Sequence, residues 1–424
     1  MFPEQPPSVP PDPVTPVPLP AVQRIVVPGT IALASVLAGL SMLGPFSIDA
    51  YLPAFPNIQA DLRATPIEVQ QTLTAYLLAF AGMVLWHGAL SDAFGRRNVI
   101  LCALVVFMVG TFGCAASHSV HYLWVFRIMQ GVSAGAGVVV GRAIIRDLYS
   151  DAAAARLLSL VTMIFSIAPA IAPIIGGWIV AYSDWRTIFL VLLGYSVALF
   201  IYCYRRLPES LPRERRQPFN PCFLWGSYST VFSSPLFHMK SGVVAFNFAG
   251  LFLYITAAPV MLPVHLGLGP SQFGWLFIPA VSGIFLGALA ANRIAGKMTF
   301  ARQIGIGFGF LLTAALINVL YHSFFPPSLP WSVAPLFAYT FGMSIIAPGA
   351  TLLSLDLFPH IRGTVASCQS FAVTMLGALV AGVIAPFLSH SVLWLAYGML
   401  VFAVAALGMW LLSRMYRRAL TARL

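Results

Sequence analysis

The sequence has 424 residues, of which 59% are hydrophobic and 8% charged, and its mean hydropathy is +0.88. Soluble domains carry about 25% charged residues, so a chain this apolar is predicted to be an integral membrane protein. The net charge of +11 does not indicate a nucleic-acid partner, because no basic segment is interleaved with the aromatic residues needed to follow a phosphate backbone.

Residues 1–28 are rich in proline, from Pro3 to Pro20. Such a segment favours extended, unpacked chain, so we expect a disordered cytoplasmic tail. The five cysteines are scattered and the histidines show no ligand spacing, so neither a disulfide framework nor a metal site is expected. The phosphate-binding pattern G-x-x-x-x-G-K-[ST] does not occur, so ATP is not the predicted energy source and no cofactor is expected.

Apolar stretches separated by short polar breaks follow the tail. Each is near the roughly 20 residues that a helix needs to cross about 30 Å of hydrocarbon. The sequence therefore predicts an all-α membrane protein with twelve transmembrane helices. The predicted spans are 30–55, 69–90, 98–116, 121–145, 156–181, 186–204, 239–262, 273–294, 302–322, 331–354, 364–388 and 391–413.

The longest break, 205–238, is rich in arginine and proline and divides the spans six and six. We therefore predict a first bundle over 29–204, a cytoplasmic linker over 205–238, a second bundle over 239–413 and a basic tail over 414–424. The halves echo each other: Asp147-Leu148-Tyr149 leaves the fourth span and Asp356-Leu357-Phe358 leaves the tenth. Two six-helix repeats around a site at mid-membrane are typical of rocking-bundle transporters.

The distribution of positive charge predicts the orientation. Of the 23 lysines and arginines, only Arg63, Arg127 and Arg186 lie outside the tails and the loops after even-numbered spans. Cytoplasmic loops carry an excess of Lys and Arg, so both termini are predicted to be cytoplasmic.

Asp49 is the only carboxylate that these predictions place well inside a span. Placing a charged side chain in hydrocarbon costs roughly several kcal/mol or more of free energy, so such a residue is rarely there without a function. An acid that one proton can neutralise is the minimal part needed to couple transport to a proton gradient. The alternative is an interfacial acid at a helix end, because Pro53 and Pro56 follow it.

Arg127 is predicted at a depth similar to that of Asp49. The first span runs outward with Asp49 late in it, and the fourth runs inward with Arg127 early in it. An arginine at that depth should face protein or a water-filled cavity. We predict that Arg127 and Asp49 act together in proton coupling; a purely structural role for Arg127 is the alternative.

The loop after the second span, Gly88 to Arg97, is predicted to act as a conformational latch, that is, to contact the other half only when the cytoplasmic side is closed. Gly95 permits a tight reversal, and Arg96 and Arg97 hold the loop in the cytoplasm. Asp92 ends a helix, where its carboxylate can face the start of the eleventh span near Thr364 and interact favourably with that helix dipole. The alternative is an ordinary basic turn that fixes topology.

The fifth span contains Pro169 and Pro173, which break backbone bonding, and Gly176 and Gly177, which permit close packing. A bent helix whose glycines pack against the second half could prevent leakage across the membrane between the halves. The alternative is a kink that only helps the helices to pack. Polar or amphipathic side chains in apolar spans are candidates for a substrate cavity or, alternatively, for bonds between helices. They are Tyr51, Tyr76, Asn247, Tyr254 and Gln369.

These motifs together resemble the major facilitator superfamily. Gly88–Arg97 is similar to its signature loop, Arg127–Gly131 to its R-x-x-Q-G, and Ala168–Gly177 to the antiporter motif G-P-x-x-G-G of drug–proton exporters. Ile48–Pro56 resembles the D-M-Y-L-P-A-x-P of the bicyclomycin and chloramphenicol exporter subgroup. The segments 69–76, 142–149 and 362–367 also look like that subgroup. In departures from the pattern, Ala93 stands where the family usually has Arg, Ala172 replaces a motif glycine and Arg362 replaces a common Ala.

The resemblance implies a twelve-span drug:proton antiporter, monomeric, in the bacterial cytoplasmic membrane. We therefore predict proton-coupled efflux of small amphiphilic molecules, with ionised Asp49 helping to admit a neutral or cationic amphiphile. The first alternative is an uptake symporter or facilitator for a metabolite, against which the antiporter motif argues. A non-transporting sensor or scaffold is a remote alternative, because the tails and the central loop are too short for a signalling domain.

Overall fold

The computed structural model describes residues 30–149, 151–165 and 167–421, and these are helices joined by turns and short loops. Its α-helices are α1 (Thr30–Asp49), α2 (Phe55–Leu62), α3 (Pro66–Phe94), α4 (Arg96–Ala115), α5 (Val120–Ala134), α6 (Ala136–Leu148), α7 (Asp151–Phe165), α8 (Ala168–Tyr182), α9 (Arg186–Arg206), α10 (Pro221–Phe232), α11 (Pro235–Val260), α12 (Gly274–Ile294), α13 (Phe300–Phe324), α14 (Ala334–Leu355), α15 (Arg362–Leu379), α16 (Ala385–Leu388) and α17 (Val392–Thr421).

Short 3₁₀ or π segments connect several of these helices. They are η1 (Leu52–Ala54), η2 (Arg213–Arg215), η3 (Met261–His265), η4 (Pro270–Gln272), η5 (Pro359–Ile361) and η6 (Val380–Ile384).

Twelve helical segments of the described chain are long and apolar enough to cross a membrane, which confirms the predicted number. Six lie between Ile31 and Arg206 and six between Pro235 and Ala419. The fourth consists of α5 and α6, which are interrupted at Gly135. The predicted tail over residues 1–28 lies outside the described residues.

Helix ends differ from prediction where local chemistry decides them. α11 begins at Pro235, four residues before the predicted span, because Ser234 is its N-cap and the side chain of Ser234 accepts a hydrogen bond from the Phe237 N–H. The predicted linker contains a helix of its own, α10. α17 continues to Thr421, so most of the predicted basic tail extends the last helix.

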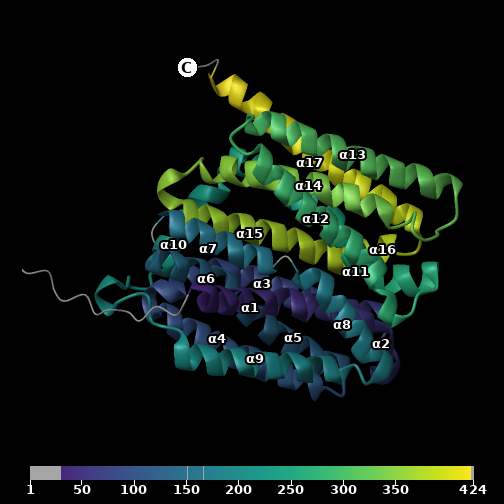
Figure 1. Ribbon diagram of the computed structural model, residues 1–424, viewed down its shortest axis with the longest axis horizontal. Coiled ribbons are helices and arrows are strands. Elements are labelled where there is room, and N and C mark those ends of the chain that lie inside the picture. Colours follow the sequence, from purple (N-terminus) through teal and green to yellow (C-terminus); the bar gives the residue numbers. More distant parts are fainter. Residues whose placement is uncertain (1–29, 150, 166, 422–424) are drawn as a thin grey trace, which may run out of the picture.

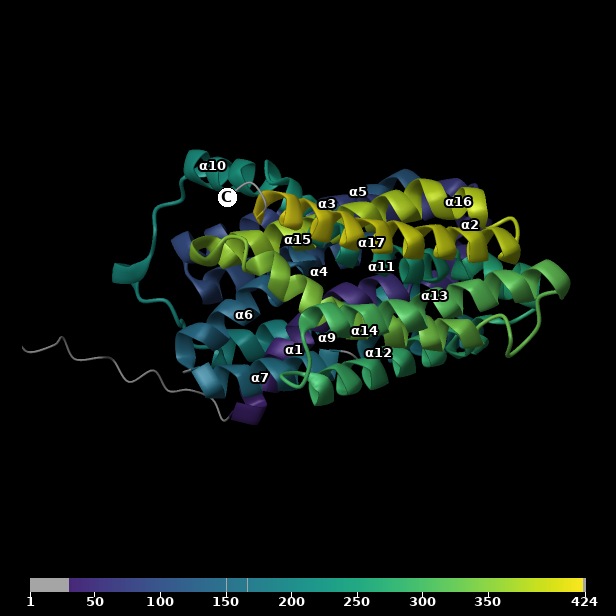
Figure 2. The ribbon, with the colours of Figure 1, turned by 90° about the horizontal axis from the view of Figure 1, so that it is seen from above.

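Figures 1 and 2 show the long helices running roughly side by side, with α10 at one end of the bundle and α2 and α16 at the other. In Figure 1 the first-half helices α4, α5 and α9 lie below, the second-half helices α13, α14 and α17 lie above, and α3 and α15 lie between them. The two halves meet where α3 packs against α15 and α8 packs against α12.

Glycines bring the helices of the first half close together. A Cβ atom on Gly131 of α5 would collide with the backbone carbonyl of Tyr76 in α3, and one on Gly137 of α6 would collide with that of Leu40 in α1. Small residues at such crossings let helix backbones approach closely. The fourth span is therefore pressed against both the first and the second, and Arg127 is carried to the centre of the first half.

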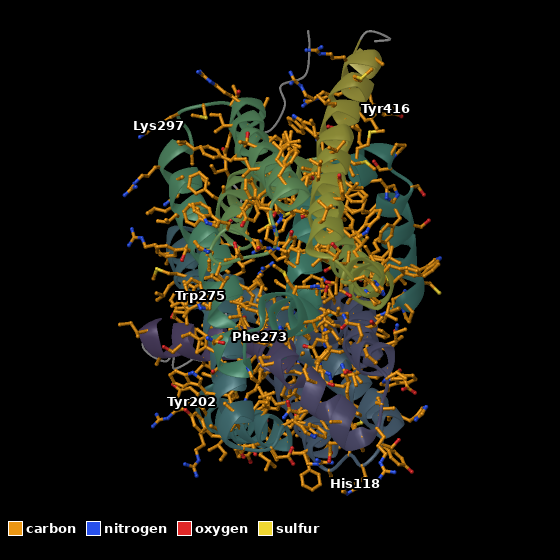
Figure 3. All side chains as sticks on the ribbon, turned by 90° about the vertical axis from the view of Figure 1, so that its right-hand side faces the viewer. His118, Tyr202, Phe273, Trp275, Lys297 and Tyr416 are labelled. Carbon is orange, nitrogen blue, oxygen red and sulfur yellow. The ribbon has the colours of Figure 1, made fainter. Side chains whose placement is uncertain are left out.

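The end that carries α10 also carries the arginines of the Gly88–Arg97 loop and of the segment 207–220, and we call it the basic end. At the opposite end the two halves are joined. Gln70 donates to the carbonyl of Ala381 (3.0 Å) and Gln71 to that of Gly382 (2.9 Å). Figure 3, viewed from this end, shows the second half above the first, with Phe273 and Trp275 near the boundary between them.

Candidate functional site

Asp49 is the last residue of α1, which contains Pro45. The chain does not leave the bundle there, because η1 and α2 extend the same span to Asp61. Asp49 is only 5% exposed. In the described part of the chain its carboxylate has neither an ion pair nor a hydrogen bond. A buried charge without a partner is costly, and binding of one proton would remove it.

Arg127 is fully buried and is held by α1, but not through Asp49. Its Nη1 donates to the carbonyl of Ser47 (3.0 Å) and to Oε1 of Gln130 (2.8 Å). Its Cζ lies 4.8 Å and 4.4 Å from the ring centres of Tyr51 and Tyr76. These five residues form the arginine cluster. The Ser47 carbonyl, the Gln130 amide oxygen and two aromatic faces stabilise the positive charge, whereas Nε and Nη2 of Arg127 have no hydrogen-bond partner among the described residues.

The predicted pairing of Arg127 with Asp49 is thus not a direct ion pair among the described residues. The cluster contacts the first span on both sides of Asp49, at Ser47 in α1 and at Tyr51 just beyond it. The part that both residues play in proton coupling stays a prediction.

The five candidate cavity residues do not lie at one place. Tyr51 and Tyr76 belong to the arginine cluster, where the Tyr51 hydroxyl and Thr72 Oγ1 share a hydrogen bond of 2.8 Å. In the second half, Tyr254 Oη accepts a hydrogen bond of 2.6 Å from Asn318. Asn247 and Gln369 are buried in the second half, and neither the side-chain amide of Asn247 nor Nε2 of Gln369 has a hydrogen-bond partner among the described residues.

The glycines of the antiporter motif lie at two contacts. A Cβ atom on Gly176 would collide with the carbonyl of Ala50, which directly follows Asp49. A Cβ atom on Gly177 would collide with the carbonyl of Pro270 in η4, which belongs to the second half. α8 therefore lies between the acid-bearing end of α1 and the other half. Pro173 is buried inside α8, and Pro169 lies in its first turn.

The Gly88–Arg97 loop is organised around Arg96. The guanidinium of Arg96 pairs with Asp92 and with Asp147 (3.1 Å), and it donates to Ser91 Oγ (2.6 Å). Arg96 is largely buried. Its role is therefore more specific than the predicted one of holding a loop in the cytoplasm.

The segment after α9 closes over this loop. The backbone N–H of Arg96, at the start of α4, donates to Oε1 of Glu209 (2.9 Å), where a carboxylate also suits the helix dipole. Gly95 is required on two counts: its φ is +95°, and a Cβ there would collide with Glu209 and Arg216. Glu209 was not predicted from the sequence, although it stands out there as an acid between Pro208 and Pro212 in a basic segment.

A cavity of about 550 Å³ opens at the basic end between α3, α6, α10 and α15. Asp92 and Thr364 both line it. No hydrogen bond joins them in the described chain, and Asp92 pairs with Arg96 instead. The latch between Asp92 and the start of α15 stays a prediction for a state in which this cavity is closed.

In the described part of the chain, twelve membrane-spanning helices form two six-helix halves that are joined at one end and open at the other, which defines a transporter fold. A family model described as the Major Facilitator Superfamily matches residues 37–374. The chain belongs to the Major Facilitator Superfamily, as its motifs predicted, and is an integral, multi-pass membrane protein.

Among curated proteins, the chain is 30% identical over 357 residues to an uncharacterized MFS-type transporter, YdgK, of Bacillus subtilis, covering 82% of this chain and 87% of that protein. It is 28% identical to a bicyclomycin resistance protein homolog of Haemophilus influenzae, with the same coverage. It is also 28% identical to multidrug resistance protein D of Escherichia coli, covering 79% and 83%. These relatives agree with the predicted subgroup.

Two solved structures share the fold at low sequence identity. A bacterial homolog of the human lysosomal transporter Spinster, in an inward-facing conformation, matches with a TM-score of 0.67 at 17% identity, covering 92% of this chain and 98% of that one. A D-xylose–proton symporter matches with a TM-score of 0.66 at 16% identity, covering 90% and 97%. At this identity the likeness concerns the fold alone.

Proposed function

We propose that this protein is a monomeric exporter that exchanges small amphiphilic molecules for protons across the bacterial cytoplasmic membrane by alternating access. The observation that carries the proposal is the buried carboxylate of Asp49, which has no partner among the described residues and directly precedes Ala50, on which the antiporter-motif glycine packs. The relatives named for bicyclomycin and multidrug resistance support export of drug-like molecules.

The contacts of α8 give proton binding a mechanical consequence. Binding of a proton at Asp49 changes the charge at the end of α1. Gly176 presses on Ala50, and Gly177 of the same helix presses on Pro270 of the other half. Because these contacts are close-packed, a displacement at the end of α1 would displace α8 and so change its contact with the other half. Two such packed arrangements would be the alternating states.

The proposed orientation places the basic end and both termini in the cytoplasm, as expected from the excess of arginine there. The cavity then opens to the cytoplasm while the outer end is closed by Gln70 and Gln71. A substrate would enter from the cytoplasm, and closure of the cavity would bring Asp92 to the start of α15. Protonation of Asp49 from outside would then favour release.

Proton release in energised inverted membrane vesicles tests this function. A pH-sensitive dye would report the response to chloramphenicol, bicyclomycin and lipophilic cations. We expect substrate-triggered proton release that is lost in Asp49→Asn. The matched control is Asp61→Asn, which should behave as wild type. Asp61 is an exposed carboxylate at the end of the molecule opposite the basic end, and it pairs with Arg186 (2.7 Å).

Contrary results separate the alternatives. If Asp49→Asn responds as fully as wild type, the coupling acid lies elsewhere. Net accumulation of a metabolite in cells, driven by the proton gradient, would indicate the uptake alternative. A non-transporting sensor would move no compound in either direction.

A further inference from the structure

The basic-end cavity has an apolar wall and a positively charged rim. Phe80 and Val84 of α3 and Val138 and Val139 of α6 contribute apolar side chains to it. Arg142 and Arg146, also of α6, line the same cavity and are exposed. Because they are four residues apart on one helix, the two guanidinium groups lie on the same face, about one turn from each other.

The acids of the cavity do not neutralise these two arginines. Its lining contains two carboxylates, Asp92 and Asp147. Both pair with Arg96, and Asp147 also accepts a hydrogen bond from Ser210 (2.8 Å). Within the described residues, neither Arg142 nor Arg146 has an ion pair or a hydrogen bond.

Other arginines at this end do have partners. Arg216 pairs with Glu209 (3.4 Å), Arg362 pairs with Asp356 (2.8 Å), and Arg97 donates to the carbonyl of Tyr204 (2.6 Å). Arg205 and Arg206, which do not line the cavity, also have no ion pair or hydrogen bond among the described residues. What distinguishes Arg142 and Arg146 is that they lack partners on the wall of a cavity.

The net charge of the cavity is positive. Three arginines (96, 142 and 146) face two aspartates (92 and 147), which leaves one positive charge, and His360 adds a group that can become cationic. A cleft lined by one sign of charge concentrates ligands of the opposite sign. The preference of basic residues for the cytoplasmic end of a span explains why arginines occur in this region. It does not explain two uncompensated guanidinium groups on the wall of a cavity.

We infer that the basic-end cavity binds amphiphilic anions, with their apolar body against α3 and α6 and a single carboxylate, sulfonate or phosphate group held by Arg142 and Arg146. Guanidinium groups bind such oxyanions through charge-assisted hydrogen bonds. This inference rests on the proposed export function and revises the expectation of a neutral or cationic substrate. The anionic group could belong to a soluble molecule or to a phospholipid headgroup, since both present the same chemistry.

Three probes with the same fluorescent ring test the preference for charge. Dansylglycine is an anion, dansylamide is neutral and dansylcadaverine is a cation. Their binding to the purified full-length protein in nanodiscs of neutral phosphatidylcholine is measured by fluorescence. We expect dansylglycine to bind roughly tenfold more tightly than dansylcadaverine, with dansylamide between them, and added salt to weaken dansylglycine most.

Paired substitutions test the assigned residues. Arg142→Gln with Arg146→Gln should weaken dansylglycine roughly tenfold and leave dansylamide within about twofold. The matched control is Arg205→Gln with Arg206→Gln, two exposed arginines at the end of α9 that do not line the cavity. It removes the same charge from the same end of the molecule and should change neither affinity. A thermal unfolding curve checks that both variants are folded.

Anionic lipid separates the two sources of the anion. If phosphatidylglycerol in the nanodiscs competes with dansylglycine in wild type but not in the cavity variant, the headgroup is an occupant of the site. If it does not compete, the site takes soluble anions. The inference is overturned if dansylcadaverine binds as tightly as dansylglycine, or if both paired variants weaken dansylglycine equally.

The two proposals can fail separately. If dansylglycine binds most tightly but no compound is transported, the assignment of the cavity stands and the export function is overturned. If neutral compounds are exported but dansylglycine is not preferred, the export function stands and the assignment of the cavity is overturned.

Discussion

At the scale of single residues, Arg127 and Asp49 show how a buried charge can be accommodated in two ways. The carboxylate has no partner in the described chain, whereas the guanidinium has a carbonyl, an amide oxygen and two ring faces. The two contacts of Arg127 with the first span, at Ser47 and Tyr51, flank Asp49. Arg127 therefore fixes the backbone beside the acid without forming an ion pair with it, as the proposed proton exchange at Asp49 requires.

We predict that Arg127→Lys impairs the protein even though the charge is retained. A lysine ammonium is a compact point charge and cannot bond Ser47 and Gln130 while lying flat on two rings. We expect the free energy of unfolding to fall by roughly 2 kcal/mol, because a buried cation would lose part of its hydrogen bonding. Thermal unfolding in detergent measures the loss, and Arg63→Lys, at an exposed position, is the control. Equal unfolding temperatures for the two variants would contradict the role given to the arginine cluster.

At the scale of elements, α8 and the segment after α9 do the positioning. α8 is pinned by glycine contacts at Ala50 and Pro270. The segment after α9 is pinned by Glu209, which accepts from the start of α4 and pairs with Arg216. Two of these contacts join parts that are more than 90 residues apart in the sequence: Gly176 packs on Ala50, and Glu209 accepts from the N–H of Arg96.

Gly176→Ala should destabilise the packing of α8 on α1. The added Cβ would meet the carbonyl of Ala50, and an overpacked contact of this kind costs about 1–3 kcal/mol. Gly194→Ala is the matched control, because that helical glycine has open space where a Cβ would lie. We expect Gly176→Ala to lower both the unfolding temperature and the substrate-triggered proton release. Wild-type values for both would show that α8 does not press on the acid-bearing end of α1.

Glu209→Gln should loosen the segment that covers the Gly88–Arg97 loop. The neutral amide binds the Arg96 N–H and Arg216 more weakly than a carboxylate does. We expect trypsin to cut at Arg213 and Arg215 several times faster in this variant. Asp184→Asn, at an exposed position away from these cleavage sites, also removes one negative charge and should be cut at the wild-type rate. A wild-type cleavage rate in Glu209→Gln would exclude this role.

At the scale of the whole molecule, the charge of the transported molecule determines the net charge that crosses the membrane in each transport cycle. Export of a neutral molecule in exchange for each proton carries one positive charge inward. Export of a monovalent anion carries two, and export of a monovalent cation carries none. The positive cavity rim favours the second case, which an inside-negative membrane potential would drive most strongly.

We therefore predict that transport of dansylglycine in proteoliposomes responds more steeply to membrane potential than transport of dansylamide. Imposing a potassium diffusion potential at constant pH, with valinomycin, measures this response. The comparison uses one protein and one fluorophore, so differences in protein orientation cancel. The same dependence for both probes would contradict export of the anionic form.

Composition and pattern alone determined the class of this protein. Runs of about 20 apolar residues can satisfy their backbone groups in lipid only as helices, so the twelve spans and their division at the arginine-rich break followed from local sequence. The motifs around Asp49, Gly95 and Gly176 likewise identified the superfamily, because each places a special residue type at a fixed spacing within one segment.

Only the tertiary structure decided which side chains meet. The depth of Arg127 and of Asp49 could be read from their spans, but the rotation of each helix about its axis could not, and that rotation places Arg127 on Ser47, Tyr51 and Tyr76. The same holds for Glu209 at the start of α4 and for the arginines of the cavity. Partners brought together across a bundle depend on helix packing, which is a property of the whole chain and not of any one segment.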